Sequence, residues 1–209
     1  MKTAYFPGIL AMAAIVVASN ILVQFLLLDG LLTWGAFTYP LAFLVTDVMN
    51  RVYGAPAARR VVLAGFVVGI LCSLIGSQIM LEFGPAVPLR VAVASGTAFL
   101  VAQLLDISVF NRLRAGAWWR APLASSVVGS AVDTGIFFTL AFSASVSFGA
   151  NADAAVAWAS DPAPLLTVGA MAPLWVTLAL ADWGVKLAIA LVALVPFRII
   201  VGAMRPSTT

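Results

Sequence analysis

Six apolar runs, each long enough to cross a lipid bilayer, are the feature that most restricts how this chain can fold. They cover residues 8–28, 33–50, 60–82, 87–111, 121–145 and 168–198. A helix of about 20 residues spans the hydrocarbon layer and satisfies its own backbone polar groups there. We therefore expect an all-α, polytopic membrane protein, a bundle of six transmembrane helices that forms a single integral membrane domain over residues 1–209. The last run is long enough to tilt, to kink at Pro173 or to extend beyond the bilayer.

The composition agrees with a bilayer as the solvent. The 209 residues are 63% hydrophobic and 9% charged, with a mean hydropathy of +1.11, whereas soluble domains are about 45–50% apolar and about 25% charged. Too few polar residues remain to cover a water-facing surface. The formal charge of +3 does not indicate a nucleic-acid partner, because the basic residues are distributed between the apolar runs instead of gathering on one soluble face.

The charges between the runs predict the orientation in the membrane. Cytoplasmic loops carry an excess of Lys and Arg, and the loops of this chain alternate in charge. One side would carry Lys2, Arg51, Arg59, Arg60, Arg112, Arg114, Arg120, Arg198 and Arg205. The other side would carry only Arg90 as a cation, together with Asp29, Glu82, Asp153 and Asp161. Both chain ends are therefore expected in the cytoplasm (N-in, C-in), in a multi-pass protein of the cell's inner membrane.

Several classes of chemistry are excluded by residues that the sequence lacks. It contains no histidine and a single cysteine, Cys72, which rules out an intramolecular disulfide, a histidine proton relay and a zinc site of the Cys/His type. No GxxxxGKS/T phosphate loop is present, so ATP hydrolysis by that motif is excluded. We expect neither an enzyme nor a metal or other cofactor. Gly129 and Gly135 are better explained by close contacts between helices.

Five ionisable residues lie within or near the ends of the predicted spans, namely Asp47, Asp106, Asp133, Asp182 and Lys186. Each costs about 2.5–3.5 kcal/mol on insertion scales, and such groups usually face a bundle interior or a watery cavity. Asp182 and Lys186 are four residues apart with the acid first, the favourable order for an ion pair on one helix. The pair either neutralises itself or holds Lys186 as a donor to a solute carbonyl, and Asp106 or Asp133 are alternative partners for the lysine.

Polar and aromatic residues repeat at helical spacing around these ionisable groups. The shared faces are Asn20 and Gln24; Tyr39, Phe43, Asp47 and Asn50; Ser95, Phe99, Gln103, Asp106 and Phe110; and Ser126, Ser130, Asp133 and Phe137. Carboxylates and amides beside aromatic rings suit a flat heteroaromatic solute with hydrogen-bond donors and acceptors on its edge. The alternative is that the hydroxyls and amides only join helices, a use worth about 0.6–2 kcal/mol per bond. The residues expected to bind a solute are Asn20, Gln24, Phe43, Asp47, Asn50, Phe99, Gln103, Asp106, Ser130, Asp133, Phe137 and Lys186.

The second run carries a specific motif. Residues 38–54 read TYPLAFLVTDVMNRVYG, and ARRV follows at residues 58–61. This segment resembles the queuosine precursor transporter family, also described as vitamin uptake-like transporters, whose hallmark is Pro-x-x-Phe-x-x-Thr-Asp-x-x-Asn-Glu-x-Tyr-Gly. The likeness extends over roughly residues 15–200 and includes Ser95, Phe99, Gln103, Asp106, Ser126, Asp133, Thr134, Lys186 and Pro196. One departure is Arg51, which stands where the family usually has Glu.

The resemblance implies the uptake of a 7-deazaguanine precursor of queuosine, such as 7-cyano-7-deazaguanine or 7-aminomethyl-7-deazaguanine, for later insertion into tRNA. The edge of a guanine-like ring would donate N1–H and N2–H to one aspartate. Its O6 would accept from Lys186, Asn50 or Gln103. One unpaired aspartate could carry a coupled proton, because burial disfavours a lone charge.

Two other functions stay open at this point. The first is a substrate-binding membrane subunit of an energy-coupling, ATP-driven vitamin-type importer, with Ala14 and Ala18 as contacts for a partner helix. The second is a membrane enzyme or a scaffold, which needs no matched polar lining. The sequence also leaves open the exact solute, the coupling ion and whether the chain forms a homo-oligomer.

Overall fold

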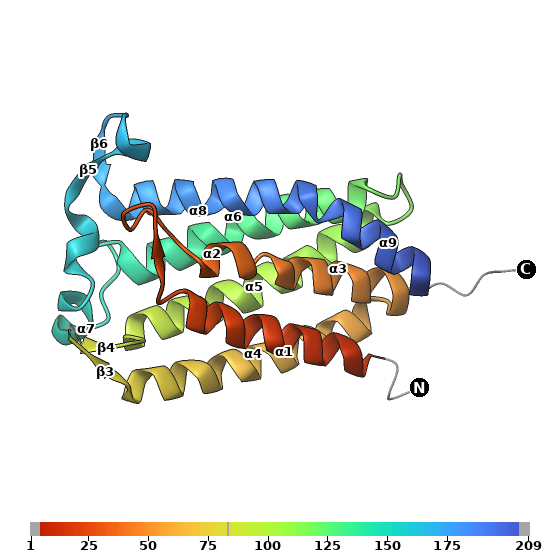
Figure 1. Ribbon diagram of the computed structural model, residues 1–209, viewed down its shortest axis with the longest axis horizontal. Coiled ribbons are helices and arrows are strands. Elements are labelled where there is room, and N and C mark those ends of the chain that lie inside the picture. The colour runs from red at the N-terminus through yellow and green to blue at the C-terminus, as the bar shows by residue number, and fades with distance from the viewer. Residues whose placement is uncertain (1–4, 83, 205–209) are drawn as a thin grey trace, which may run out of the picture.

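Long helices that run roughly side by side make up the body of the molecule (Figure 1). The computed structural model describes residues 5–82 and 84–204, so the predicted loop cations Lys2 and Arg205 lie outside the described residues. The α-helices are α1 (Phe6–Leu22), α2 (Gly35–Thr38), α3 (Leu41–Tyr53), α4 (Ala55–Gln78), α5 (Leu89–Leu113), α6 (Arg120–Phe142), α7 (Ala150–Ala154), α8 (Leu174–Val192) and α9 (Leu194–Met204). Two short 3-10 helices are η1 (Ala157–Ser160) and η2 (Leu165–Thr167).

Three short antiparallel ribbons, which the all-α prediction did not include, lie in the connections. They pair β1 (Leu26–Leu27) with β2 (Leu32–Thr33), β3 (Met80–Leu81) with β4 (Gly84–Pro85), and β5 (Pro162–Pro164) with β6 (Met171–Pro173). Each ribbon lets the backbone polar groups of a connecting segment bond to one another.

Within residues 5–82 and 84–204, four helices, α4, α5, α6 and α8, are long and apolar enough to cross a membrane. Among the described residues, α1 with 17 residues and α9 with 11 are shorter apolar helices. Large apolar side chains remain exposed on α4, among them Leu63, Val67, Leu74 and Ile75. Because exposed apolar surface of this kind is unfavourable in water and favourable in lipid, the chain is a mainly helical, multi-pass membrane protein.

The first apolar run does not stay helical over its predicted length. Helix α1 ends at Leu22, and the chain then turns into the ribbon β1–β2. At the tip of this ribbon Leu28, Asp29 and Gly30 have φ of 51°, 54° and 88°, which no helix accommodates. The prediction of a helix over residues 8–28 is therefore wrong in its C-terminal part, because hydropathy does not distinguish an apolar helix from an apolar hairpin.

Prolines explain the two interruptions of the predicted second and sixth spans. Pro40 separates α2 from α3, and Pro196 lies in the first turn of α9, just after the break at Ala193. Proline has no N–H to donate to the carbonyl four residues earlier. Pro173 instead has an extended backbone (ψ 138°) and precedes α8, so the last run becomes helical only at Leu174. Of the alternatives for this run, a kink at Pro173 is excluded, because Pro173 precedes the helix start, and the helix is interrupted at Ala193 instead.

The two ends of the bundle differ in their connections. Helix α1 begins and α9 ends at the same end, on the right of Figure 1, where the α3–α4 turn and the α5–α6 loop also lie. The α3–α4 turn is made at Gly54, whose φ of 83° favours glycine. Among the described residues, the loop cations other than Arg90 fall in the α5–α6 loop, near the adjoining ends of α3 to α6, and in α9. The ribbons and α7 lie at the opposite end (Figure 1).

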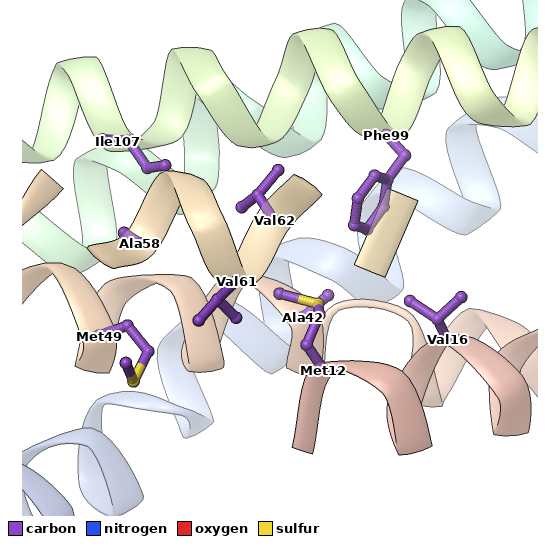
Figure 2. Packing of buried hydrophobic residues seen from close by; sticks show 9 residues of the cluster. All are labelled: Met12, Val16, Ala42, Met49, Ala58, Val61, Val62, Phe99 and Ile107. Atoms are coloured by element: carbon purple, nitrogen blue, oxygen red, sulfur yellow. The ribbon is translucent and has the colours of Figure 1, made fainter. Parts of the chain in front are cut away.

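An apolar core lies between α1, α3, α4 and α5 (Figure 2). Its buried members are Met12, Val16, Ala42, Met49, Ala58, Val61, Val62, Phe99 and Ile107. Small residues let these helices approach closely: a Cβ added at Gly8 would lie 2.5 Å from Sδ of Met49, and one at Gly65 would lie 2.5 Å from Cγ of Met12. In lipid, such close packing is a main source of association between helices.

The two glycines of α6 behave differently from each other. A Cβ added at Gly129 would lie 2.8 Å from Cε1 of Phe43 and 3.4 Å from Cβ of Asp106. The described residues place no atom within 4 Å of the corresponding point at Gly135. The prediction of a close helix contact is therefore confirmed for Gly129 and wrong for Gly135.

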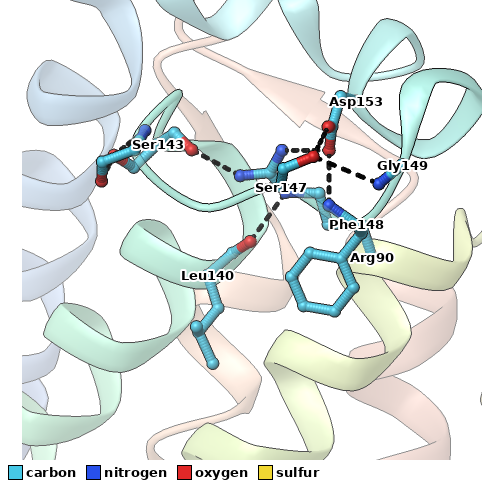
Figure 3. A network of polar contacts seen from close by, with 8 residues as sticks. Arg90, Leu140, Ser143, Ser147, Phe148, Gly149 and Asp153 are labelled. Atoms are coloured by element: carbon cyan, nitrogen blue, oxygen red, sulfur yellow. Dashed lines mark hydrogen bonds and ion pairs between the residues drawn. The ribbon is translucent and has the colours of Figure 1, made fainter.

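Arg90, near the start of α5, joins the ends of α5 and α6 that lie away from the chain termini (Figure 3). Its Nε donates to the carbonyl of Leu140 at 2.8 Å and its Nη2 to the carbonyl of Ser143 at 2.6 Å. These carbonyls belong to the C-terminal end of α6, which lacks intrahelical donors. A buried arginine therefore satisfies the end of a neighbouring helix.

The same guanidinium reaches Asp153 of α7, with 2.9 Å between Nη1 and Oδ1. The pKa of the Asp153 carboxyl lies below its ordinary value, because the Ser147 hydroxyl and the Phe148 N–H donate to it and Arg90 is positively charged. A lowered pKa in the folded chain means that this contact stabilises the fold above the ordinary pKa of an aspartate and is lost as the pH falls through the lowered value.

Candidate functional site

Lys186 lies at the centre of a closed polar network between α6 and α8. Its Nζ is 2.7 Å from Oδ2 of Asp133, 2.6 Å from Oδ2 of Asp182 and 2.9 Å from Oγ1 of Thr134. The Thr134 hydroxyl donates in turn to Oδ2 of Asp182 at 3.0 Å. An ammonium has three N–H donors, and here three protein oxygens surround it. In this conformation Lys186 therefore has no N–H directed at a solute.

Tyr39 connects this network to α3 and α5. It lies at the break between α2 and α3, and its hydroxyl donates to Oδ1 of Asp133 at 2.8 Å. Its ring lies 5.3 Å from Nζ of Lys186, a cation–π contact. Phe43 and Phe99 pack edge-on against the same ring. We call Tyr39, Asp133, Thr134, Asp182 and Lys186 the lysine cluster.

The predicted Asp182–Lys186 pair on one helix is confirmed, and Asp133 joins it as a second carboxylate partner. Asp106, the other alternative, does not pair with the lysine. One ammonium thus faces two carboxylates, of which Asp133 is buried and Asp182 is partly exposed. The neutral donors Tyr39 and Thr134 add one hydrogen bond to each carboxylate.

A second buried polar group lies where α3, α5 and α6 meet. It consists of Asp47 and Asn50 of α3, Gln103 and Asp106 of α5, and Ser125 and Ser126 of α6, and we call it the carboxyl layer. The hydroxyls of Ser125 and Ser126 donate to Oδ1 and Oδ2 of Asp47 at 3.1 and 3.3 Å. Asp47 and Asp106 lie between two hydrogen bonds that join α3 to α5, Thr46–Gln103 and Asn50–Ile107.

Four polar atoms of the carboxyl layer lack a hydrogen bond of ordinary geometry to any described residue. They are both carboxyl oxygens of Asp106, Oδ1 of Asn50 and Nε2 of Gln103. The other ends of the two amides are engaged, because Asn50 donates to the Ile107 carbonyl at 3.3 Å and Gln103 accepts from Thr46 at 2.6 Å. Buried polar atoms without partners are costly and rare, so their presence in one layer indicates a functional region.

A narrow pocket touches both polar groups. It is lined by Pro40, Phe43, Leu44, Asp47, Pro122, Ser126, Ser130, Lys186, Ala190, Ala193, Leu194 and Phe197, which come from α3 and its start, α6, α8 and α9. The space open to the centre of a water molecule is ≈ 10 Å³, about the room that one water needs. A ring the size of guanine does not fit, so the pocket is closed in this conformation.

A wider hollow of ≈ 450 Å³ lies at the end of the bundle that carries the cations. Arg51, Trp118 and Arg198 are among its lining residues, and the guanidinium of Arg198 stacks on Trp118 at 4.9 Å. Phe197 lines both this hollow and the narrow pocket. Phe197 is therefore a residue that the closed polar pocket and the open basic hollow share.

The structure brings most of the twelve predicted site residues together. Phe43, Asp47, Ser130 and Lys186 line the narrow pocket, and Asp133 reaches it through Lys186. The ring of Phe99 contacts Tyr39 of the lysine cluster. Three more of the predicted residues, Asn50, Gln103 and Asp106, belong to the carboxyl layer.

Three predicted site residues lie elsewhere. Asn20 donates to the Val16 carbonyl of its own helix, and Gln24 reaches the Ala86 carbonyl beside the ribbon β3–β4. Phe137 packs with Phe138 and Phe142. Helical spacing alone put them in the set, and spacing does not say which way a face points.

Several functional candidates were not in the predicted set. Thr134 and Ser125 follow or precede predicted polar positions by one residue, so a search for paired hydroxyls would have found them. Phe197 and Leu194 carry no such signal, because an apolar side chain at a pocket wall has the same sequence pattern as one that faces lipid.

The arrangement suits binding better than covalent chemistry. A carboxylate, an ammonium, hydroxyls and a phenyl ring converge on one pocket, which is the set of groups that orients a polar, flat ligand. Among the described residues no group of three metal-ligating side chains occurs.

Comparisons with known proteins agree with this picture. Residues 33–201 match the family described as "Putative vitamin uptake transporter". The chain is similar to the "Queuosine precursor transporter" of Escherichia coli (strain K12), with 35% identity over 195 residues that cover 87% of this chain and 79% of the relative. It is also similar to the "Probable queuosine precursor transporter" of Haemophilus influenzae, with 35% identity over 78% of this chain and 66% of the relative. A protein of the same printed name from Bacillus subtilis is 31% identical over 53% of this chain and 56% of the relative. No solved structure matches the chain.

Proposed function

The chain belongs to the vitamin uptake transporter family, and from this premise we propose that it imports a queuosine precursor across the cell's inner membrane for tRNA modification. The solute would be a 7-deazaguanine such as 7-cyano-7-deazaguanine or its aminomethyl relative. The members of this family are transporters, so we propose movement of an unchanged solute and no enzymatic step.

The proposed topology has six crossings in a single membrane domain with both ends in the cytoplasm. The crossings would be α1, the α2–α3 pair, α4, α5, α6 and the α8–α9 pair, since α2 and α3 run on from one another and so do α8 and α9 (Figure 1). An even number of crossings agrees with the start of α1 and the end of α9 at one end of the bundle. The cations concentrate at that end, which favours it as the cytoplasmic side.

The observation that carries the proposal is the convergence of Asp47, Lys186 and Phe43 on one pocket inside the bundle. The Asp47 carboxylate would accept N1–H and N2–H from the guanine-like edge, and Phe43 would stack on the ring. Lys186 would donate to O6 once it leaves one of its present oxygens. A desolvated pocket makes each unmatched polar group costly, which would supply selectivity.

The closed pocket fits a carrier that opens to one side at a time. We propose that the cytoplasmic opening lies at Phe197, because this residue lines both the pocket and the basic hollow. Helix α9 is separated from α8 by the break at Ala193, so it can move without disturbing Lys186. Its outward movement would join the two spaces and release the solute to the cytoplasm.

Uptake of a labelled deazaguanine by cells that cannot make queuosine precursors tests the proposal. We expect Asp47→Asn and Asp133→Asn to lose most uptake, and Asp161→Asn, an exposed loop residue, to keep it. Equal uptake by all three variants would remove the proposed lining. Purified chain alone in lipid vesicles separates the carrier from a subunit of an ATP-driven importer, since the subunit would need its ATPase partners.

Accessibility of the pocket tests the opening. In a Cys72→Ser background, a cysteine introduced by Ser130→Cys should react slowly with a water-soluble thiol reagent. The additional change Phe197→Ala should speed the reaction, whereas Phe137→Ala, outside the pocket, should not. If Ser130→Cys reacts at the same rate with and without Phe197→Ala, the opening lies elsewhere.

A further inference from the structure

The carboxyls of Asp47 and Asp106 lie in the same interface between α3 and α5 with almost no exposure to solvent. Asp47 is 2% exposed and Asp106 is 0% exposed, and the Thr46–Gln103 and Asn50–Ile107 hydrogen bonds join α3 to α5 on either side of them. Two carboxylates in contact inside a low-dielectric environment cannot both ionise at neutral pH, so one of them keeps a proton. The pair then titrates as one unit.

Hydrogen bonds indicate which member keeps the proton. Asp47 accepts from the Ser125 and Ser126 hydroxyls, which favours its charged form. Neither oxygen of Asp106 accepts a hydrogen bond of ordinary geometry from a described residue. These bonds favour Asp106 as the member of the pair that holds the proton, with its O–H directed at the Asp47 carboxylate.

The charges around the pair leave this assignment intact. Helix α8 presents Lys186 to the same pocket as Asp47, but that ammonium is already bound to Asp133 of α6 and Asp182 of α8. At the cytoplasmic end Arg114 donates to the Asn50 and Arg51 carbonyls, and Arg51 stacks on Phe110. The buried face that α4 turns toward α3 and α5 is apolar in the described residues, with Ala58, Val61 and Val62. Arg198 of α9 stacks on Trp118.

The pair also adjoins the proposed solute position. Asp47 lines the narrow pocket, whereas Asp106 lies behind it, on α5. Two further atoms without partners, Nε2 of Gln103 and Oδ1 of Asn50, belong to the same layer. The proton on Asp106 lets Asp47 stay charged in the closed, dry pocket, and the charged Asp47 can accept N1–H and N2–H from the solute, so binding of solute and retention of the proton are linked through one side chain.

We propose that the Asp47–Asp106 pair carries the proton that drives solute uptake, one proton entering with each solute molecule. This rests on the proposed transport function. On the external side water delivers H⁺ to the pair, giving Asp106–COOH beside Asp47–COO⁻. On the cytoplasmic side the opened pocket admits water, which allows both carboxylates to be charged, so Asp106–COOH gives its proton to water and becomes Asp106–COO⁻. No bond of the solute changes. One positive charge crosses per cycle in addition to any charge on the solute.

Purified full chain in lipid vesicles, with the membrane voltage held at zero, tests this with a labelled 7-cyano-7-deazaguanine. A gradient of one pH unit, acid outside, should drive about tenfold accumulation, because one proton per solute transfers the whole tenfold ratio. A protonophore should abolish it. Asp106→Asn should bring the ratio to 1 while solute exchange stays measurable, and Asp161→Asn should accumulate like the parent.

The outcomes separate the two proposals. Exchange without any response to the pH gradient in the parent chain, or full accumulation by Asp106→Asn, overturns the proton proposal and leaves the transport proposal standing. A parent chain that neither binds nor exchanges the solute overturns the transport proposal instead.

Infrared spectroscopy gives a reading that depends on neither solute nor transport. The parent chain in lipid at neutral pH should show the C=O stretch of one protonated carboxyl, lost in Asp106→Asn and retained in Asp161→Asn. The absence of that band in the parent chain would overturn the proposal even if Asp106→Asn failed to fold.

Discussion

The lysine cluster and the carboxyl layer are both buried, both built on α6 and both in contact with the narrow pocket, yet they are satisfied to different degrees. In the lysine cluster, Lys186 has three oxygens around it and each carboxylate has a charged and a neutral donor. In the carboxyl layer, neither oxygen of Asp106 accepts a hydrogen bond from a described residue, and the amides of Asn50 and Gln103 each have one atom without such a bond.

From this difference we expect the lysine cluster to contribute mainly to stability and the carboxyl layer mainly to activity. A complete buried network fixes the relative position of its helices, since breaking one bond leaves a charge uncompensated. An incomplete network holds its helices weakly and keeps atoms available for a proton or a solute. The lysine cluster would then fix the positions of the helices around the site, and the carboxyl layer would bind the proton or the solute.

Removal of the ammonium should have the largest effect. Lys186→Met leaves Asp133 and Asp182 as two buried carboxylates without a counter-charge, and we expect a loss of about 3–5 kcal/mol in the free energy of unfolding. Denaturant titration in detergent micelles measures it. The double change Lys186→Met with Asp133→Asn should recover part of the loss, and a double variant no more stable than the single one would contradict the charge balance described here.

Crowding the contact between α3 and α6 should have the next largest effect. Gly129→Ala puts a Cβ 2.8 Å from Cε1 of Phe43, and overpacking of this kind costs about 1–3 kcal/mol. Gly135→Ala is the matched control, because it adds the same methyl to the same helix with open space around it. Thermal unfolding of the two variants should differ in sign or clearly in size, and equal shifts would show that α3 and α6 are not closely packed at Gly129.

Loss of a single bond in the lysine cluster should cost less. Tyr39→Phe removes the hydroxyl donor to Asp133 and keeps the ring contacts with Lys186, Phe43 and Phe99. A hydrogen bond to a charged group contributes about 1.5–3 kcal/mol, and we expect the lower end because Lys186 still compensates the carboxylate. Tyr53→Phe, at an exposed position, should change the unfolding free energy by less than about 0.5 kcal/mol. If both changes cost the same, the Tyr39 bond is not formed.

The smallest effect on stability is expected in the carboxyl layer. Asp106→Asn breaks no hydrogen bond of ordinary geometry, and the new amide can donate to Asp47, so the unfolding free energy should change by less than about 1 kcal/mol. The comparison is tested by measuring the unfolding free energies of Asp106→Asn and Asp133→Asn side by side, since Asp133→Asn loses its ionic contact with Lys186. A loss at Asp106 as large as that at Asp133 would mean that the two groups are equally satisfied.

Much of the membrane fold follows from local properties of the sequence. Long apolar runs gave α4, α5 and α6 nearly at their predicted positions, because length and hydropathy act within one segment. The boundaries failed at the ribbon β1–β2 and at Pro40 and Pro173, where backbone dihedrals and missing donors decide the structure. Hydropathy contains no information on either.

The sequence by itself determined that ionisable residues are buried in lipid-exposed helices, that cations gather between certain runs, and that Asp182 can meet Lys186, since each is a matter of spacing along one segment. Only the tertiary structure decided that Lys186 takes Asp133 as well, that both oxygens of Asp106 lack a hydrogen-bond partner among the described residues, and that Phe197 lines the narrow pocket. The physical reason is that the partner of a buried charge depends on how helices distant in sequence cross. Close packing around residues such as Gly129 stabilises that crossing. The spacing of residues along one helix does not predict such contacts.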